Sequence, residues 1–139
     1  IHARSPNARV FVVNYPDILP SGSGCWPTIP LSFGDVPYLH ATEERLNQML
    51  ATTAAANGAT LVDWYTPSIG HDACKGSSTR WVEPLIPGEL SAPVHPNKAG
   101  MAGAAVAWRP DERPWMMFVA WPVCDAAAVF LTGPKRVDV

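Results

Sequence analysis

One of the four histidines lies in a stiff segment immediately before a predicted helix, which makes it a candidate for acid–base chemistry. His95 lies between Pro93 and Pro96, and each proline fixes its own φ angle and removes a backbone donor. Asn97 follows, and its side chain can cap a helix over residues 99–107. Histidine is the usual proton shuttle near neutral pH. We interpret His95 as a general base; the alternative, which composition alone favours, is a histidine in an ordinary proline-rich turn.

A histidine base needs an acceptor that orients its ring and a nucleophile whose proton it takes. The position three residues before His95 is Ala92, which has no carboxylate, but the Ala92 backbone carbonyl can hold the Nδ1 proton. Asp63 and Asp72 are weaker side-chain alternatives for this supporting role. The sequence contains no Gly-x-Ser-x-Gly motif, and Ser21–Gly24 is better explained as a flexible turn. No nucleophile motif is recognisable.

The cysteines and the remaining histidines suggest structure rather than metal binding. His71, Asp72 and Cys74 are clustered, but they lack the CxxC or HxxxH spacing of metal sites, so we predict no metal site. Cys25 and Cys74 lie on the two loops that leave the predicted strand ends, so a disulfide between them is geometrically sensible. Two buried free thiols are the alternative. Cys124 has no evident partner.

Length and composition indicate one soluble domain or part of one. The chain has 139 residues, of which 47% are hydrophobic and 16% charged, and its net charge is −2. No run of lysines and arginines is present, so we predict no nucleic-acid partner.

Hydrophobic patterns predict a strand, a long helix and a second strand. Residues 8–15 and 60–65 are apolar runs without polar alternation, which is typical of strands buried on both faces of a parallel sheet. Asp35 is the expected N-cap of a helix that reaches residue 57. Its predicted buried stripe is Leu39, Leu46, Met49, Leu50 and Ala54, and its predicted solvent face is Glu43, Glu44, Arg45, Asn47 and Gln48. This order implies a parallel crossover in an α/β fold, with ligands at the carboxyl ends of the strands.

The tail after residue 107 differs in character. Trp115–Gly133 is dense in Trp, Met, Phe, Val and Ala, and it is long enough to raise the question of a membrane span. Pro122 and Asp125 lie at its middle, where an Asp costs about 2.5–3.5 kcal/mol. We therefore do not expect a span, and the alternatives are a buried terminal element or a non-native extension.

Several sequence blocks together resemble the secreted actinobacterial branch of the SGNH (GDSL-type) esterases and lipases. The likeness covers about residues 1–107 and corresponds to the C-terminal half of such an enzyme. The blocks, in chain order, are Ala8–Pro20, Cys25–Pro27, Gly34–Leu39, Asn57–Ala59, Asp63, Ile69–Cys74, Arg80–Val82 and Pro93–Gly100.

This resemblance implies a flavodoxin-like three-layer α/β/α sandwich with a parallel sheet, here without its N-terminal half. It also implies cofactor-free hydrolysis of small-molecule or lipid esters through a serine acyl-enzyme. His95 matches the family's base, whereas the Ser, Gly and Asn blocks would lie upstream of Ile1. The family's usual Asp three residues before the histidine is Ala92 here, and similar members use a main-chain carbonyl at that position. We therefore expect a chain that supplies the base but neither nucleophile nor oxyanion hole, and that is inactive by itself.

The resemblance also favours the Cys25–Cys74 disulfide and hence secretion. No signal peptide is recognisable at the start, so we expect the chain to begin in mid-domain. Residues 1–107 would be the hydrolase part and residues 108–139 an atypical tail. The alternative function is a non-catalytic fragment or binding module that pairs with a partner, possibly its own missing half, through an exposed sheet edge.

Overall fold

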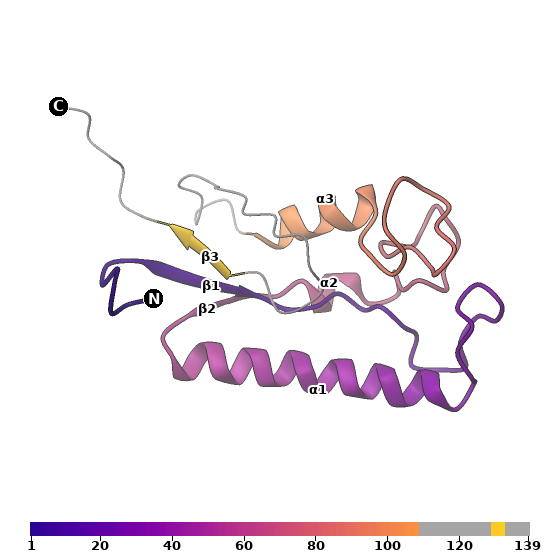
Figure 1. The fold of residues 1–139 in the computed structure, drawn as a ribbon, viewed down its shortest axis with the longest axis horizontal. Coiled ribbons are helices and arrows are strands. Elements are labelled where there is room, and N and C mark those ends of the chain that lie inside the picture. The colour runs from indigo at the N-terminus through magenta and orange to yellow at the C-terminus, as the bar shows by residue number, and fades with distance from the viewer. Residues whose placement is uncertain (109–128, 133–139) are drawn as a thin grey trace.

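The structure, a computed structural model, describes residues 1–108 and 129–132 (Figure 1). Its elements, in chain order, are β1 (Arg9–Val13), α1 (Asp35–Ala56), β2 (Thr60–Val62), α2 (Tyr65–Ser68), α3 (Lys98–Ala107) and β3 (Val129–Thr132). Figure 1 shows α1 on one side of the strands and α3 on the other. The alternation of strands and helices makes this an α/β fold, as predicted.

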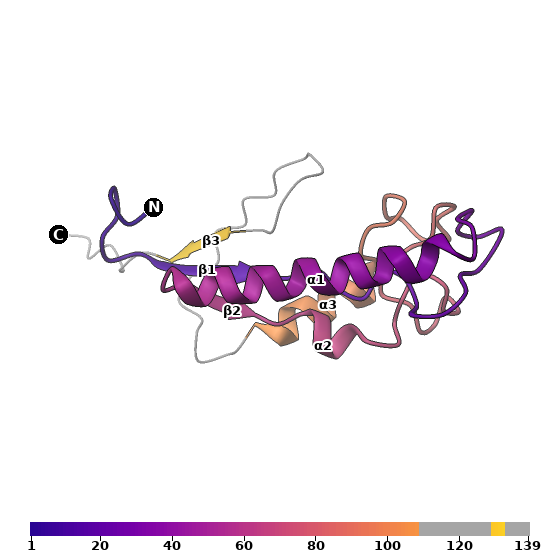
Figure 2. The same ribbon diagram turned by 90° about the horizontal axis from the view of Figure 1, so that it is seen from below.

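The sheet is small and has β1 at its centre. β1 pairs with β2 in parallel, with Phe11 opposite Thr60, which confirms the predicted parallel pairing of these two segments. β3 pairs with the other edge of β1 in the antiparallel sense, with Phe11 opposite Phe130. Figure 2 shows β1 between its two neighbours. The parallel prediction for residues 1–107 therefore holds for β1 and β2, and the tail adds an antiparallel edge strand, which is a common arrangement on a parallel sheet.

Helix α1 begins one residue earlier than predicted. The N-cap is Gly34, and Asp35, the predicted cap, is the first helical residue. The reason is Ser32, whose hydroxyl accepts the Asp35 N–H at 3.3 Å, so that the entry to the helix is stabilised from before Gly34. The Asp35 carboxylate still lies in the first turn, where a negative charge suits the helix dipole.

The buried face of α1 is only partly the predicted one. Ala54 is buried as predicted and Leu50 is half-buried, but three other members of the predicted stripe are exposed, namely Leu39, Leu46 and Met49. Asn47, assigned to solvent by the periodicity, is buried. The cause is the chain that leaves β1, whose backbone groups need partners. The Asn47 side chain accepts the Tyr15 N–H at 2.9 Å and donates to the Tyr15 carbonyl at 3.0 Å.

The second strand is shorter than predicted. β2 ends at Val62, and Tyr65–Ser68 form the helical turn α2 instead of extending the strand. Asn14, which follows β1, accepts the N–H groups of Trp64 (2.6 Å) and Tyr65 (3.0 Å), so its amide turns the chain at this point.

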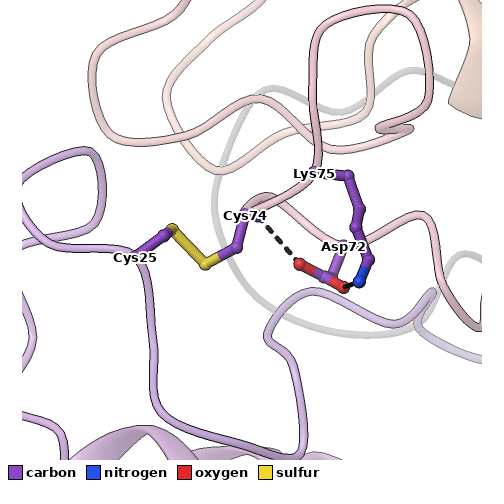
Figure 3. Close-up of a disulfide and its surroundings, with 4 residues drawn as sticks. All are labelled: Cys25, Asp72, Cys74 and Lys75. Carbon is purple, nitrogen blue, oxygen red and sulfur yellow. Dashed lines mark hydrogen bonds and ion pairs between the residues drawn. A yellow bond between two sulfur atoms is a disulfide. The ribbon is translucent and has the colours of Figure 1, made fainter.

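Two apolar clusters hold the described part of the chain together. One lies at the sheet and contains Phe11, Val62 and Trp108. The other lies among the loops, where Cys25 and Cys74 pack against it. The predicted disulfide joins these two cysteines, with Cα atoms 5.4 Å apart (Figure 3). The loops after the two parallel strands are thus fixed to each other.

Apart from β3, the tail after residue 108 lies outside the described residues, and so does most of the apolar run Trp115–Gly133, on which the predictions for the tail depend. Within the described ranges, no helix has the length and apolar character needed to cross a membrane.

Candidate active site

The segment that carries His95 is held as a short antiparallel partner of residues 81–83. Val82 and Pro96 form an isolated antiparallel bridge. The Glu83 N–H donates to the His95 carbonyl at 2.9 Å, and the Val94 N–H donates to the Glu83 carbonyl at 3.1 Å. The stiffness predicted from the two prolines therefore comes from backbone pairing as well.

The His95 ring is oriented by a main-chain carbonyl, as expected, but the carbonyl belongs to a different residue. Nδ1 lies 2.8 Å from the carbonyl oxygen of Pro93. The Ala92 carbonyl, predicted for this role, instead accepts the backbone N–H of His95 at 3.1 Å. Because that bond closes a tight turn over residues 92–95, the next carbonyl along is the one that faces the ring.

Backbone strain lies directly beside this ring. Val94 has a φ of 59°, a left-handed conformation that is unusual for a β-branched residue. Such strain persists only where the surroundings enforce it, and it tends to lie at functional sites. Here the bond from the Val94 N–H to Glu83 enforces it.

This arrangement defines what the imidazole can do. A carbonyl oxygen only accepts hydrogen bonds, so Nδ1 carries the proton and the lone pair of the neutral ring is on Nε2. The ring is exposed, so Nε2 is open to a substrate or to a nucleophile from outside these residues. The neighbouring Ser91 is engaged elsewhere, since its hydroxyl donates to the Pro96 carbonyl at 2.9 Å.

A buried charge, Glu83, supports the His95 segment, and the sequence analysis did not identify it. Its side chain is 0% exposed. Arg80 donates to both carboxylate oxygens, at 3.0 and 2.8 Å, and the Gly88 N–H donates to Oε2 at 2.8 Å. These bonds, those from Arg80 first, lower the pKa of Glu83 to about 2. The available signal was an Arg and a Glu three residues apart within an otherwise apolar block.

Asn97 connects this buried charge to helix α3. Its Oδ1 accepts the Gly100 N–H at 3.0 Å, which confirms the predicted helix cap. Its Nδ2 donates to Glu83 Oε1 and to the Arg80 carbonyl, both at 2.9 Å. One amide therefore fixes the start of the helix relative to the His95 segment.

Small residues let α3 approach Trp81 closely. A Cβ on Gly100 would collide with the Trp81 carbonyl, and a Cβ on Gly103 would collide with the Trp81 ring. The Trp81 ring also stacks on the His71 ring, with centroids 4.4 Å apart. His71 is thus used in packing.

The two supporting carboxylates proposed from sequence bond to backbone and neighbouring side chains. Asp72 is buried; it accepts the Cys74 N–H at 2.9 Å and pairs with Lys75 at 3.5 Å (Figure 3). Asp63 accepts the Thr66 N–H at 3.1 Å and the Asn14 amide at 3.0 Å. Burial acts to raise the pKa of Asp63, but these hydrogen bonds outweigh it and lower the pKa. The contacts of Asp63 and of Asp72 are those of residues that hold the backbone of a loop in place.

A second polar group lies under α1. Asp17 is buried, and its Oδ1 lies 3.5 Å from His40 Nδ1. Glu43 accepts the Ile18 N–H at 3.3 Å, and burial raises its pKa to about 8. Within the described residues, no group of His, Cys, Asp and Glu side chains has the arrangement of a metal site.

Comparison of the sequence with known proteins identifies its family. The sequence pattern of the GDSL-like Lipase/Acylhydrolase family matches residues 1–102. "Lipase 2" of Streptomyces coelicolor is 46% identical over 102 residues, which are 72% of this chain and 35% of that protein. "Lipase 1" of the same organism is 34% identical over 103 residues, covering 74% of this chain and 37% of that protein. No solved structure matches significantly.

The matched region contains β1, α1, β2, the disulfide and the whole His95 segment, and it ends within α3. The chain spans about a third of the length of these curated relatives. The chain belongs to the GDSL-like lipase/acylhydrolase family.

Proposed function

We propose that this chain supplies the general base of a carboxylic ester hydrolase that works through a serine acyl-enzyme, and that His95 is this base. The observation that carries the proposal is the contact between His95 Nδ1 and the Pro93 carbonyl, which leaves Nε2 as the proton acceptor. Membership of the lipase/acylhydrolase family supports ester hydrolysis as the reaction.

In this mechanism His95 Nε2 takes the proton of a serine hydroxyl as the oxygen attacks the acyl carbon of a small-molecule or lipid ester. The same nitrogen then returns the proton to the leaving alcohol. The Pro93 carbonyl keeps the Nδ1 proton in place and stabilises the imidazolium that forms. The serine and the oxyanion-hole donors would come from a part of the enzyme outside these residues, and we propose no cofactor.

The proposed division of the chain follows the family match. Residues 1–107 would form the C-terminal part of a three-layer α/β/α hydrolase domain, and residues 108–139 would be an added tail. The match to residues 1–102 and the positions of α1 and α3 on opposite sides of the sheet support this assignment. The disulfide supports export to an oxidising compartment.

The alternative, a non-catalytic module that pairs through its sheet edge, has weaker support. β1 has a strand on both edges, so a partner strand would have to use the outer edge of β2 or of β3, which are three and four residues long. A partner that contributes the rest of the hydrolase domain remains part of the main proposal.

The test is complementation. The part of Streptomyces coelicolor Lipase 2 that this chain does not match is fused ahead of residues 1–139, and hydrolysis of a p-nitrophenyl ester is measured. We expect turnover that the two separate pieces lack. A folded, soluble fusion without turnover would contradict the proposal.

A further inference from the structure

One peptide group connects the buried Glu83 to the His95 ring. It contains both the Pro93 carbonyl, which lies 2.8 Å from His95 Nδ1, and the Val94 N–H, which donates to the Glu83 carbonyl at 3.1 Å. This peptide group is trans and planar, so its C=O and its N–H point in opposite directions. The bond that holds the N–H on Glu83 therefore also turns the carbonyl toward the imidazole.

The opposite orientation of this peptide would suit the backbone of Val94 better. The φ of Val94 is 59°, and turning the peptide over would bring it to about −120°, in the β region that β-branched residues prefer. The turned peptide would present its N–H to the ring in place of its carbonyl. Nδ1 would then have to accept a hydrogen bond, and the neutral ring would carry its proton on Nε2. The strained orientation is thus the one that leaves Nε2 free to take a proton.

Glu83 is held firmly enough to maintain the strained orientation. Both of its backbone groups bond to the His95 segment, since its N–H donates to the His95 carbonyl at 2.9 Å and its carbonyl accepts from Val94. Its side chain is fully buried and accepts hydrogen bonds from three residues, namely Arg80, Gly88 and Asn97. Glu83 therefore cannot shift without breaking bonds of its backbone and of its side chain together.

We propose that Glu83 is a positioning residue for His95 that acts through the Pro93–Val94 peptide. It holds this peptide in the strained orientation and so keeps the imidazole in the Nδ1–H form, with the Nε2 lone pair free. The inference deepens the proposed function, on which its consequence for turnover rests. The step from Glu83 to the ring tautomer needs no turnover, so it can be measured in the chain itself.

The first experiment records long-range 15N–1H correlation spectra of the neutral His95 ring in the full 139-residue chain, for the wild type, V94P and V94G. Proline removes the N–H that bonds to Glu83 and requires a φ near −65°, which excludes the strained orientation. Glycine keeps the N–H and adopts a positive φ without strain. We expect V94P to lower the ratio of Nδ1–H to Nε2–H rings about tenfold, the equivalent of one net hydrogen bond. V94G should retain the wild-type tautomer.

The second experiment tests the Glu83 side chain with E83Q, which keeps its shape but removes the charge that pairs with Arg80. We expect the tautomer ratio to fall, as in V94P. In the Lipase 2 fusion we expect kcat to fall in proportion to the Nδ1–H fraction with KM unchanged, because the buried side chain does not reach an ester. The matched control is E89Q, an exposed Glu of the same loop, which should change neither the spectrum nor the kinetic constants.

The inference is overturned if V94P and E83Q keep the wild-type tautomer, or if V94G loses it. Hydrogen exchange of the Val94 amide in the wild-type chain decides the matter even where a variant does not fold. The amide should be protected by its bond to Glu83, and exchange as fast as in a free peptide would overturn the inference as well. Failure of the proposed function has a different signature, since an H95Q fusion that keeps its turnover would leave the tautomer results unchanged.

Discussion

At the scale of single residues, the account depends on which nitrogen of His95 carries the proton. The Pro93 carbonyl at 2.8 Å selects Nδ1–H, because the opposite tautomer would place a lone pair against an oxygen lone pair. Long-range 15N–1H correlation spectra of the neutral ring should therefore show an Nδ1–H tautomer. A predominant Nε2–H tautomer would remove the proton acceptor that the proposed mechanism needs.

Glu83 provides a residue-scale test of how the His95 segment is held. Replacing Glu83 with Ala leaves Arg80 without its buried partner, and breaking such a pair costs about 3–5 kcal/mol. We expect E83A to lower the free energy of unfolding in urea by an amount in this range. The matched control is E89Q, an exposed Glu of the same loop, which should stay within about 0.5 kcal/mol of the wild type. Equal effects of the two changes would contradict the assigned role.

The low pKa of Glu83 also makes the folding stability depend on pH. Its folded pKa of about 2 lies below the ordinary 4.5, so the folded state releases the proton more readily than the unfolded state. The stabilisation is therefore present above about pH 4.5 and is lost as the pH falls toward 2.

At the scale of elements, helix α1 places several polar side chains on its inner face and leaves several aliphatic ones exposed. His40, Glu43 and Asn47 face inward and bond to the chain that leaves β1. The arrangement gives the loop after β1 partners for its backbone, at the cost of a partly buried carboxyl at Glu43.

Glu43 should make stability fall as the pH rises. Its folded pKa is about 8 and its ordinary value is 4.5, so between these values the folded state holds a proton that the unfolded state has released. The free energy of unfolding should then decrease from about pH 4.5 to pH 8. E43Q removes this titration, and we expect a higher melting temperature than the wild type at pH 8 and a smaller difference at pH 5. E89Q, which changes an exposed Glu that does not contribute to the pKa shift of Glu43, should not change the slope.

The sequence predicted the elements better than their faces. The β1–α1–β2 order and the Asn97 cap follow from local patterns, and local patterns suffice for them. Which side of α1 is buried depends on the chain that leaves β1, which is distant in sequence. The backbone groups of Tyr15 need hydrogen-bond partners, and the Asn47 side chain supplies them, so Asn47 is buried. The hydrophobic periodicity of the helix sequence contains no information about the hydrogen-bonding needs of a distant loop.

The same limit applies at the site. The disulfide predicted from position and resemblance is present in the structure, whereas the role of His95 stays a prediction. Glu83 was missed because its importance arises only when Arg80, Gly88 and Asn97 converge on it in space. The acceptor for the ring was assigned one residue too early, since sequence does not show which carbonyl a tight turn leaves facing inward.

The disulfide connects elements and should carry a large share of the stability. It closes a sequence separation of 49 residues, which in the chain-entropy model is worth about 4 kcal/mol. Double replacement C25S/C74S should lower the free energy of unfolding by about that amount, and reductant should do the same to the wild type. A loss below about 1 kcal/mol in both experiments would show that the two loops are held by other contacts.

At the scale of the whole molecule, we propose that the chain is one part of a catalytic unit. It spans about a third of its curated relatives, and it presents exposed apolar side chains on both α1 and α3. We expect the purified 139-residue chain to hydrolyse a short-chain p-nitrophenyl ester at the rate of buffer. Turnover at the rate of an enzyme from the isolated chain would mean that a nucleophile exists within it.

The most direct measurement is kcat of the Lipase 2 fusion with His95 and with H95Q. If His95 is the base, H95Q should lower kcat on the order of 10⁴-fold or more, because loss of one member of a Ser–His unit disables the unit. The matched control is H2Q, which changes an exposed histidine that contacts Ala8, and it should leave kcat unchanged. An H95Q fusion that folds and keeps a kcat within tenfold of the parent would contradict the central claim.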